Sequence, residues 1–320
     1  MGLLLFLLFS LSLPVAAADG RVLSISVDPL RVEVEESWKV AADFGMRGQV
    51  ITWKWSDLEP KWRGYRSTDV MDAVRFLGKE KEFRLLINLQ VIQGTRRTVP
   101  QDLQFAAFDS PRMQERFRKL IDEIIPYLDS HVAYWVIGDE VDLYLARHPR
   151  EWTAYKRFYE QAASYVRSRL PGMKMGVCVT HEGARGPDSG KIQMLTRVSD
   201  IWVTTYTAMG EDFRPLGPSE AKTALFEMTE LAAGRPTVIQ RLGYSSSRAL
   251  ESSEEEQADF IEEAFRAWEL LGEKISFLNL WCMRDPTEAE CDELAAWYGF
   301  LEIPAFSPFI RSIGLRQVDG

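Results

Sequence analysis

Residues that build metal centres and disulfide frameworks are scarce in this sequence. It contains three cysteines and three histidines among 320 residues, and no cluster of them has the spacing of metal ligands. Cys178, Cys282 and Cys291 cannot form the even-numbered framework of a small disulfide-rich domain. We expect buried free thiols, with a Cys282–Cys291 bridge as the alternative, and neither a metal nor another cofactor.

A basic surface is missing as well. Lysine and arginine number 38 against 47 aspartate and glutamate residues, and the net charge is −9 with no basic stripe along the chain. Nucleic acids bind proteins through clustered positive charge. The sequence therefore disfavours nucleic acid as a partner.

Long hydrophobic runs are absent except at the beginning of the chain. The apolar run Leu3–Val15 is followed by the three alanines Ala16–Ala18. This run is too short to span a bilayer, and its small-residue end is typical of a secretory signal peptide. We expect residues 1–18 to be removed, the protein to be secreted or periplasmic, and no membrane association after cleavage.

The remaining residues, 19–320, contain no low-complexity linker and are interpreted as one domain. Short apolar segments alternate with helical ones, and strands are predicted at 22–27, 49–55, 83–90, 132–138, 174–180, 200–206, 236–240 and 275–281. Eight such units in about 300 residues indicate a single α/β (β/α)8 TIM barrel. An open doubly wound sheet is the alternative, but no glycine-rich phosphate turn follows the first strand.

The segment Tyr134–Asp142 organises this interpretation. It begins as an apolar strand and ends in three carboxylates among four residues, Asp139, Glu140 and Asp142. Acids found only at the C-terminal end of a strand lie at the rim of a parallel barrel, where such barrels carry their chemistry. We therefore expect Glu140 to be the catalytic residue, with a capping or salt-bridging carboxylate as the alternative.

Residues that follow the other predicted strands should meet Glu140 at the same mouth. They combine carboxylates, amides and aromatic rings, which suit sugar hydroxyls and sugar faces. From the second strand to the eighth they are Trp53 and Trp55, Asn88 and Gln90, Asp139 and Glu140, His181 and Glu182, Tyr206, Arg241, and Trp281 and Asp285. We expect an oligosaccharide or polysaccharide as partner, although core packing is the alternative role for each aromatic residue.

Two motifs carry a resemblance to the clan A (β/α)8 glycoside hydrolases, whose catalytic acids lie on strands four and seven. Residues 51–60, ITWKWSDLEP, with Gly64-Tyr65 after them, look like the W-x-x-x-E-P-x-x-G-x-Y segment of those enzymes. Residues 135–140, WVIGDE, are similar to their G-N-E motif, with Asp139 in place of the asparagine. Glu59 of the first motif is interpreted as a structural loop carboxylate.

The resemblance implies a role for each matched position. Glu140 would be the general acid/base, and Asp139, Tyr206 and Trp281 would contact the sugar. Together with the rim positions, the expected substrate-binding residues are Trp55, Asn88, Asp139, His181, Tyr206, Arg241, Trp281 and Asp285.

The seventh strand departs from that pattern. Residues 238–244, VIQRLGY, look like the V-x-x-E-x-G-Y segment in which the glutamate is the nucleophile, but Arg241 stands at its position. A retaining glycosidase needs two carboxyl groups about 5–5.5 Å apart. A guanidinium offers no lone pair for attack and would hold Glu140 ionised. The sequence therefore predicts that Arg241 points into the mouth within reach of Glu140 and that the retaining reaction is lost.

Three functions remain open at this point. The chain is a glycoside hydrolase with rearranged chemistry, in which Glu182, Asp139 or Asp285 is the base of an inverting mechanism, or it is an inactive carbohydrate-binding barrel. The third is a barrel enzyme of another class, such as a lyase that uses His181 and Tyr206, because fold alone does not determine function.

Overall fold

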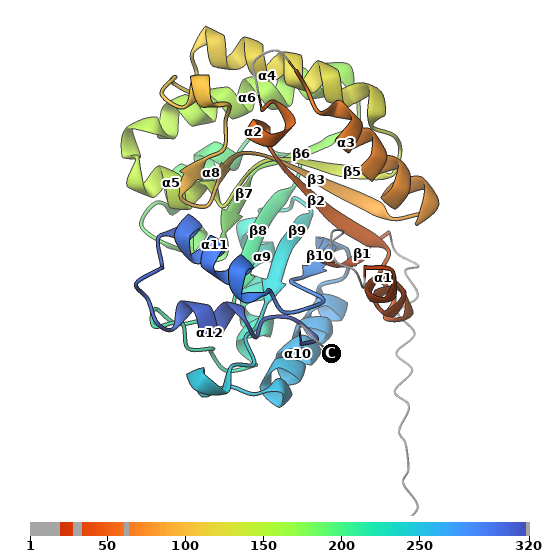
Figure 1. Cartoon of the computed structure of the whole chain (residues 1–320), viewed down its shortest axis with the longest axis vertical. Helices are drawn as coiled ribbons and strands as arrows, with labels where there is room; N and C mark the ends of the chain where they lie inside the picture. The colour runs from red at the N-terminus through yellow and green to blue at the C-terminus, as the bar shows by residue number, and fades with distance from the viewer. Residues whose placement is uncertain (1–19, 28–33, 61–63, 318–320) are drawn as a thin grey trace, which may run out of the picture.

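The computed structural model describes residues 20–27, 34–60 and 64–317. The expected leader and its cleavage after Ala18 lie outside the described residues. In the described part, parallel strands form a barrel that is surrounded by helices (Figure 1). The predicted (β/α)8 architecture is confirmed.

The barrel follows the strand order β6-β5-β3-β2-β1-β10-β9-β8-β7. β6 and β7 are two pieces of the predicted fifth strand, interrupted at Val177, so the two ends of this order meet and the barrel closes. A short strand, β4 (Arg96–Arg97), pairs antiparallel with β3 at the mouth. The barrel strands are β1 Val22–Ile25, β2 Gly48–Lys54, β3 Arg84–Gln93, β5 Val132–Asp139, β6 Lys174–Gly176, β7 Cys178–Thr180, β8 Trp202–Thr207, β9 Thr237–Gly243 and β10 Ile275–Leu280.

Side chains inside the barrel change from apolar to polar along the strands. Near the strand N-termini the filling is apolar, from Val22, Leu86, Val136, Cys178, Ile201, Val203, Val238 and Phe277. Above it lies a layer of hydrogen-bonded polar side chains. Ser24 Oγ donates to Asn279 Oδ1 (2.7 Å), and Asn88 Nδ2 donates to Gln240 Oε1 (3.0 Å). This polar layer forms the floor beneath the carboxylates of the mouth.

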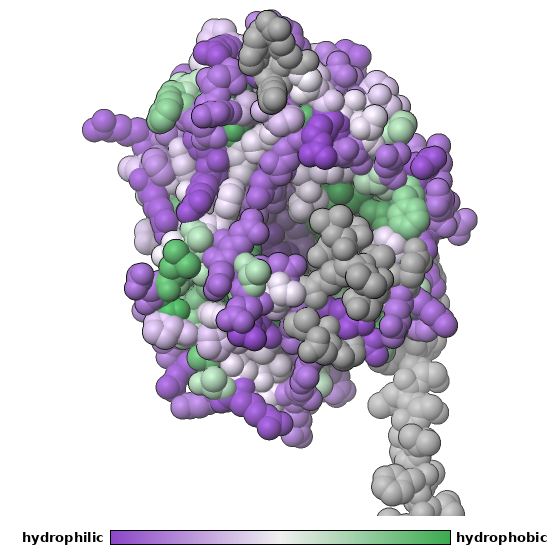
Figure 2. All heavy atoms as spheres, viewed as in Figure 1, coloured by the Kyte–Doolittle hydropathy of each residue, from purple (hydrophilic) through white to green (hydrophobic). Residues whose placement is uncertain are grey.

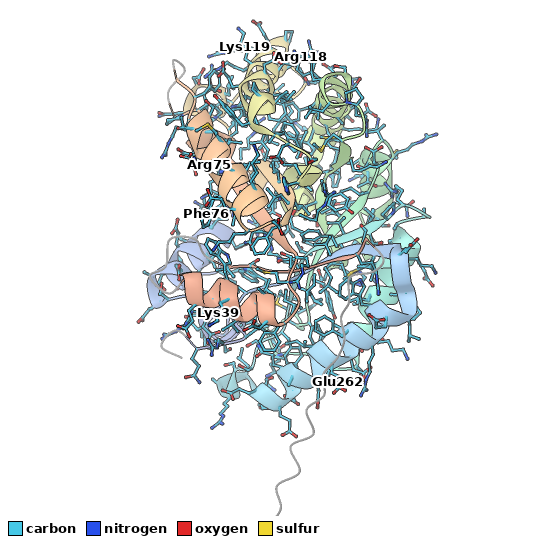
Figure 3. The ribbon with its side chains drawn as sticks, turned by 90° about the vertical axis from the view of Figure 1, so that its right-hand side faces the viewer. Lys39, Arg75, Phe76, Arg118, Lys119 and Glu262 are labelled. Atoms are coloured by element: carbon cyan, nitrogen blue, oxygen red, sulfur yellow. The ribbon has the colours of Figure 1, made fainter. Side chains whose placement is uncertain are left out.

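Amphipathic helices cover the outside of the barrel. In the side view, Lys39 of α1 and Glu262 of α10 lie on these helices (Figure 3), and both side chains are exposed. None of the described helices is long and apolar enough to cross a bilayer. The outer helices are α1 Val34–Asp43, α3 Ser67–Ala73 with the π-helix Val74–Glu80, α4 Pro111–Ile124, α6 Trp152–Arg169, α8 Ser189–Thr196, α9 Glu220–Leu231 and α10 Glu254–Leu271.

Shorter helices lie in the connections. Those that follow strand C-terminal ends are α2 Trp55–Leu58, α5 Val141–Arg147 and α7 His181–Arg185, and the last two helices are α11 Glu288–Tyr298 and α12 Phe306–Ile310. The 3-10 turns are Gln101–Leu103, Ile125–Tyr127, Pro149–Glu151, Arg248–Leu250 and Gly272–Lys274.

The last long helix, α11, does not pack on the outside of the barrel. Its C-terminal end lies at the mouth, where Trp297 Nε1 donates to Gln93 O (2.9 Å) and Thr95 Oγ1 donates to Trp297 O (3.0 Å). Arg96 also donates to the carbonyl of Ala296. Figure 1 shows α11 and α12 in front of the strand ends. The helix that follows the eighth barrel strand therefore covers the mouth.

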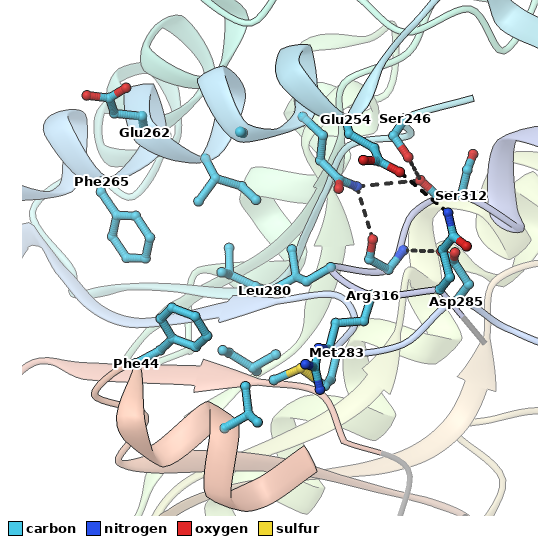
Figure 4. Close-up of a pocket in the computed structure, with 18 of the residues that line it drawn as sticks. Phe44, Ser246, Glu254, Glu262, Phe265, Leu280, Met283, Asp285, Ser312 and Arg316 are labelled. Carbon is cyan, nitrogen blue, oxygen red and sulfur yellow. Dashed lines mark hydrogen bonds between the residues drawn. The ribbon is translucent and has the colours of Figure 1, made fainter. Parts of the chain in front are cut away.

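A groove lies on the outer side of β1 and β10, between α1 and α10. Its volume is about 2560 Å³, and its walls are apolar between charged rims. Phe44 and Phe265 face one another across it in Figure 4. The same close-up places Asp285 at this groove, where its Oδ1 accepts from Gly314 N (2.7 Å).

Candidate active site

Glu140 reaches the mouth through an unusual backbone turn at the end of β5. Gly138 has φ +86°, and a side chain there would collide with the Tyr155 hydroxyl and with Val141. Glu140 itself has φ +47°, in the left-handed region that is uncommon for a residue other than glycine. Strained positions of this kind concentrate at functional sites. The turn starts α5 and leaves the Glu140 carboxylate at the mouth, where its side chain is 11% exposed.

Arg241 is aimed into the same mouth by an irregularity in β9. Three residue steps in β9, from Ile239 to Leu242, stand opposite two steps in β10, from Leu278 to Leu280. One extra residue of this kind is a β-bulge, which redirects side chains and is frequent next to active sites. Gln240 and Arg241 consequently both hydrogen-bond to Asp139 inside the barrel, although they are neighbours in the chain.

Arg241 forms ion pairs with both acids at the end of β5. Its Nη2 lies 2.7 Å from Glu140 Oε1, and its Nη1 lies 2.9 Å from Asp139 Oδ2. The prediction that Arg241 lies within reach of Glu140 is confirmed. Asp139 also accepts from Gln240 Nε2 (2.8 Å) and Gln90 Nε2 (3.2 Å), so donors surround both of its oxygens.

Two further donors hold the Glu140 carboxylate. Thr205 Oγ1 donates to Oε1 (2.8 Å), and the Tyr298 hydroxyl of α11 donates to Oε2 (2.8 Å). Burial alone would raise the pKa of Glu140, but the Arg241 charge and the hydrogen bonds from Arg241, Thr205 and Tyr298 bring it below its ordinary value. Glu140 is therefore a carboxylate at neutral pH, without the proton that a general acid must donate.

Tyr298 is a site residue that the sequence did not reveal. It stands 158 residues beyond Glu140, at the end of a helix whose pattern carries no sign of a site. Burial and the neighbouring Glu140 charge raise the pKa of Tyr298 well above its ordinary value, so its hydroxyl remains a donor. We call the hydrogen bond from Tyr298 of α11 to Glu140 the latch. Beside it, Lys54 Nζ lies 4.3 Å from the ring centroid of Trp297 and makes a cation–π contact.

A cleft of about 1090 Å³ contains this site. The space-filling view shows a recess near the centre of the face viewed, ringed largely by hydrophilic residues (Figure 2). Among the residues expected at the site, Glu140, Tyr206, Arg241 and Trp281 line the cleft. Glu182, Trp53, Trp297 and Tyr298 line it as well. The structure therefore brings together Glu140 and three of the eight substrate-binding residues expected from the sequence, and it adds aromatic walls from α11.

The structure corrects the expected role of Trp55. The strand β2 ends at Lys54, and Trp55 begins α2 with its side chain fully buried. Its Nε1 donates to Glu59 Oε2 (2.8 Å), and its ring packs against Phe117 at 5.0 Å. Trp53, two residues earlier, is the tryptophan of this segment that lines the cleft. Glu59, which also accepts from Arg116 Nε (2.7 Å), is a structural carboxylate as interpreted.

The structure also corrects the expected sugar-binding role of Asn88 and Asp139. Both point into the barrel, but both are completely buried, Asn88 in the polar layer and Asp139 beneath Arg241. Neither lines the cleft, so neither is placed to contact a sugar directly. Their part is to hold Gln240 and Arg241 in position.

His181 and Asp285 also lie away from the cleft lining. His181 is 2% exposed, with Nε2 3.0 Å from Glu227 Oε2 and its ring edge against Tyr206. Burial lowers the pKa of His181 and outweighs the influence of Glu227. Asp285 lines the outer groove, although Arg284 and Pro286 on either side of it line the cleft. These positions provide neither a base for a lyase at His181 nor an inverting base at Asp285.

Two acids beside Glu140 have raised pKa values. Desolvation inside the protein raises the pKa of Asp142 to about 7, although Thr180 donates to both of its oxygens at 2.9 and 2.6 Å. Desolvation by the surrounding walls, together with the charges of Glu140 and Asp142, raises the pKa of Glu182 to about 7. Glu182 remains open to the cleft, so it is the carboxyl here that is able to exchange a proton with a ligand.

No group of three or more His, Cys, Asp or Glu side chains in the described ranges is arranged to hold a metal ion. The three cysteines are free thiols, with Cys178 and Cys291 buried. The donor set of the mouth consists of carboxylates, amides, hydroxyls and aromatic rings, which is suited to an uncharged or cationic organic ligand.

The fold is shared with glycoside hydrolases of known structure. No family model and no curated protein matches the sequence. Among solved structures, GH5_18 from Streptomyces cattleya in complex with GlcNAc matches with a TM-score of 0.71 and 14% identity, covering 94% of this chain and 76% of that one. GH5_18 from Bifidobacterium longum subsp. longum matches with a TM-score of 0.67 and 16% identity, covering 94% and 76%.

A third similar structure is the exo-beta-1,4-mannosidase Op5Man5 from Opitutaceae bacterium strain TAV5. It matches with a TM-score of 0.67 and 17% identity over 93% of this chain, which spans 56% of the mannosidase. At these identities the likeness establishes the fold. The chain thus shares its (β/α)8 barrel fold with these glycoside hydrolases.

Proposed function

We propose that this chain binds a saccharide in the cleft at the barrel mouth and does not cleave it by the retaining double displacement. The observation that carries the proposal is Arg241, which occupies the strand-seven position and is ion-paired with both Asp139 and Glu140. Glycoside hydrolases with this fold place the nucleophilic carboxylate at the corresponding position, according to the motif resemblance.

The chemistry of the pair opposes two requirements of the first step of the retaining reaction. The first step requires a carboxylate nucleophile, and a protonated guanidinium has no lone pair to attack an anomeric carbon. The same step requires a protonated general acid, whereas Arg241 and the other donors lower the pKa of Glu140. Each defect alone would suppress the reaction.

The lining of the cleft supports a saccharide as ligand. Trp281 and Tyr206 are placed beside the polar groups of the mouth, and aromatic faces of this kind stack on sugar rings. Related barrels hold sugars: GH5_18 from Streptomyces cattleya is in complex with GlcNAc, and a variant of it is in complex with Manb1-4GlcNAc. We extend this ligand class to the present cleft.

Titration calorimetry with short oligosaccharides tests the proposal. We expect weak but saturable binding, and Trp281→Ala should weaken it about fivefold to tenfold through loss of about 1 kcal/mol of stacking. Phe105→Ala is the matched control, because Phe105 is a fully exposed aromatic residue outside the cleft. Absence of binding across glucose, mannose, N-acetylglucosamine and glucosamine oligomers would contradict the proposal.

One observation favours a second candidate, an inverting hydrolase. Glu182 is open to the cleft and its pKa is raised to about 7, so it is suited to donate a proton while the ionised Glu140 activates water. Hydrolysis of aryl glycosides, followed by NMR of the anomer first released, distinguishes this candidate from simple binding. Inverted product that disappears in Glu182→Gln would establish it.

We also propose that the protein acts outside the cytoplasm, on the basis of the apolar run Leu3–Val15 and the alanines after it. Mass spectrometry of the exported protein should give an N-terminus at Asp19. An intact N-terminus at Met1 would contradict this part of the proposal.

A further inference from the structure

Glu182 is an acid in the cleft whose carboxylate forms no ion pair with the residues that the structure describes. Among the described residues, no side chain donates a hydrogen bond to it, whereas its acidic neighbours are all engaged. Glu140 is held by three donors and Asp142 by Thr180. The nearest cation on its own helix, Arg185, is directed at Glu227, with Nη1–Oε2 at 3.2 Å. An exposed carboxylate at the wall of a cleft is thus available to a ligand.

The charges around Glu182 favour a cation in that place. The group formed by Asp139, Glu140 and Arg241 adds no net positive charge to the cleft, because one guanidinium faces two acids and Glu140 is ionised. The Glu140 and Asp142 charges act on Glu182 in the direction that disfavours a further negative charge. A ligand cation beside Glu182 would relieve this repulsion and would pair with the carboxylate through charge-assisted hydrogen bonds.

The aromatic lining fits the same kind of ligand. Tyr206 lies close enough to Glu182 for that charge to raise the pKa of the Tyr206 phenol, after the larger effect of burial. Trp281, which follows the eighth barrel strand, is half-buried in the same lining, with the Arg241 guanidinium carbon 5.9 Å from its ring centroid. Tyrosine and tryptophan faces attract ammonium groups as well as sugar C–H groups.

We infer that the cleft selects a saccharide that carries a free ammonium group, an amino sugar, and that Glu182 is the counter-ion of that ammonium. The inference rests on the proposed saccharide-binding function and specifies its ligand class. An N-acetylated sugar keeps the ring and the hydroxyls but loses the charge, so the site should discriminate between the two forms. Charge-assisted hydrogen bonds are roughly twice as strong as neutral ones, which corresponds to about a tenfold preference.

The test compares three tetrasaccharide probes by calorimetry at pH 7 and constant ionic strength: a glucosamine tetramer, an N-acetylglucosamine tetramer and cellotetraose. We expect the glucosamine tetramer to bind about tenfold more tightly than the other two. In Glu182→Gln the affinity for the glucosamine tetramer should fall to that for cellotetraose, so the preference disappears, and Glu182→Asp should retain part of the preference.

Glu211→Gln is the matched control, because it removes the same charge from an exposed position outside the cleft of a protein with net charge −9. It should leave the preference unchanged. Equal affinities for all three probes, or a preference that survives in Glu182→Gln, would overturn the inference and leave the proposed function standing. Failure of all three probes to bind would instead overturn the proposed function.

Discussion

Asp139 and Arg241 are bidentate partners inside the barrel mouth, with Nη1–Oδ2 at 2.9 Å and Nη2–Oδ1 at 3.2 Å. They are also the two positions at which the strand-four and strand-seven segments depart from the motifs that they resemble, where asparagine and glutamate stand. The two departures therefore contact one another. A buried guanidinium requires a counter-ion, and the exchange of asparagine for aspartate supplies it.

The first prediction reverses these two departures separately and together. Arg241→Glu alone places three carboxylates together at the mouth, and we expect it to lower the free energy of unfolding by about 3–5 kcal/mol. Adding Asp139→Asn should recover most of that loss, because it removes one of the three charges. Urea denaturation of both single variants and the double variant measures the coupling.

The same variants test the chemistry. A 2-fluoro glycoside should leave no covalent adduct on the wild-type protein, as judged by intact mass, and the double variant should acquire one at residue 241. An adduct on the wild-type chain would show that another carboxylate is the nucleophile, and peptide mapping would identify it.

A second prediction concerns the latch between α11 and the barrel. Tyr298→Phe removes one donor from the buried Glu140 carboxylate, so the free energy of unfolding should fall by about 2 kcal/mol and amide exchange in α11 should accelerate. The control is Tyr165→Phe, which removes a comparable hydroxyl–carboxylate contact, to Asp122 at 2.8 Å, on the outside of the protein. Unchanged exchange in residues 288–298 would mean that the other contacts hold α11 alone.

A third prediction follows from Asp142. Its pKa is raised in the folded protein from an ordinary 3.8 to about 7, so the folded state holds the proton more tightly than the unfolded state. The resulting stabilisation is fully present below pH 3.8 and is lost as the pH rises through 7.

Asp142→Asn keeps the shape and an oxygen for the Thr180 amide but cannot titrate. Between pH 4 and pH 8 the wild type should lose up to about 4 kcal/mol of stability relative to this variant. Denaturant titrations at several pH values measure the difference, and Asp259→Asn on the exposed face of α10 serves as control. Parallel curves for wild type and Asp142→Asn would refute the buried-proton interpretation.

The fourth prediction separates buried from exposed ion pairs. Glu59 is 1% exposed and accepts from both Trp55 and Arg116. Glu59→Ala leaves the buried Trp55 Nε1 unpaired, while Arg116 keeps its ion pair with Asp102 (2.9 Å), so the variant should cost about 1–3 kcal/mol. Glu115→Ala removes the exposed partner of Lys119, and its effect should fall within about 0.5 kcal/mol. Thermal unfolding of the two variants tests this difference in stability, and similar melting temperatures would contradict the prediction.

The parts of this protein that the sequence predicted are those governed by strand pattern. Alternating apolar strands and helices specify a parallel barrel, and the acids after β5 and the arginine of β9 then have to share one mouth. The strand pattern alone therefore predicts that Glu140 and Arg241 lie together. The pattern does not predict side-chain directions that depend on where a strand ends. β2 ends at Lys54, one residue before the predicted end at Trp55, so the Trp55 side chain points away from the mouth.

The strand pattern also does not predict how deeply a side chain is buried or which residues distant in the sequence contact each other. Asn88 faces inward as expected, but one layer too deep to meet a ligand. Asp285 follows the eighth strand as expected, but its side chain lines the outer groove while its two chain neighbours line the cleft. Tyr298 reaches the site because α11 lies over the mouth and not on the outside of the barrel. The sequence of residues 288–298 contains no pattern that predicts this position.

The distance in sequence between Glu140 and Tyr298 has a consequence for biosynthesis. A ribosome that has delivered all eight barrel strands has not yet delivered the end of α11, since β10 ends at Leu280 and the latch stands at 298. The ion pair of Arg241 with Glu140 is therefore available for assembly before the cover that shields it. A newly made chain therefore passes through a stage in which the ion pair can form while the wall that Trp297 and Tyr298 add to the cleft is still missing.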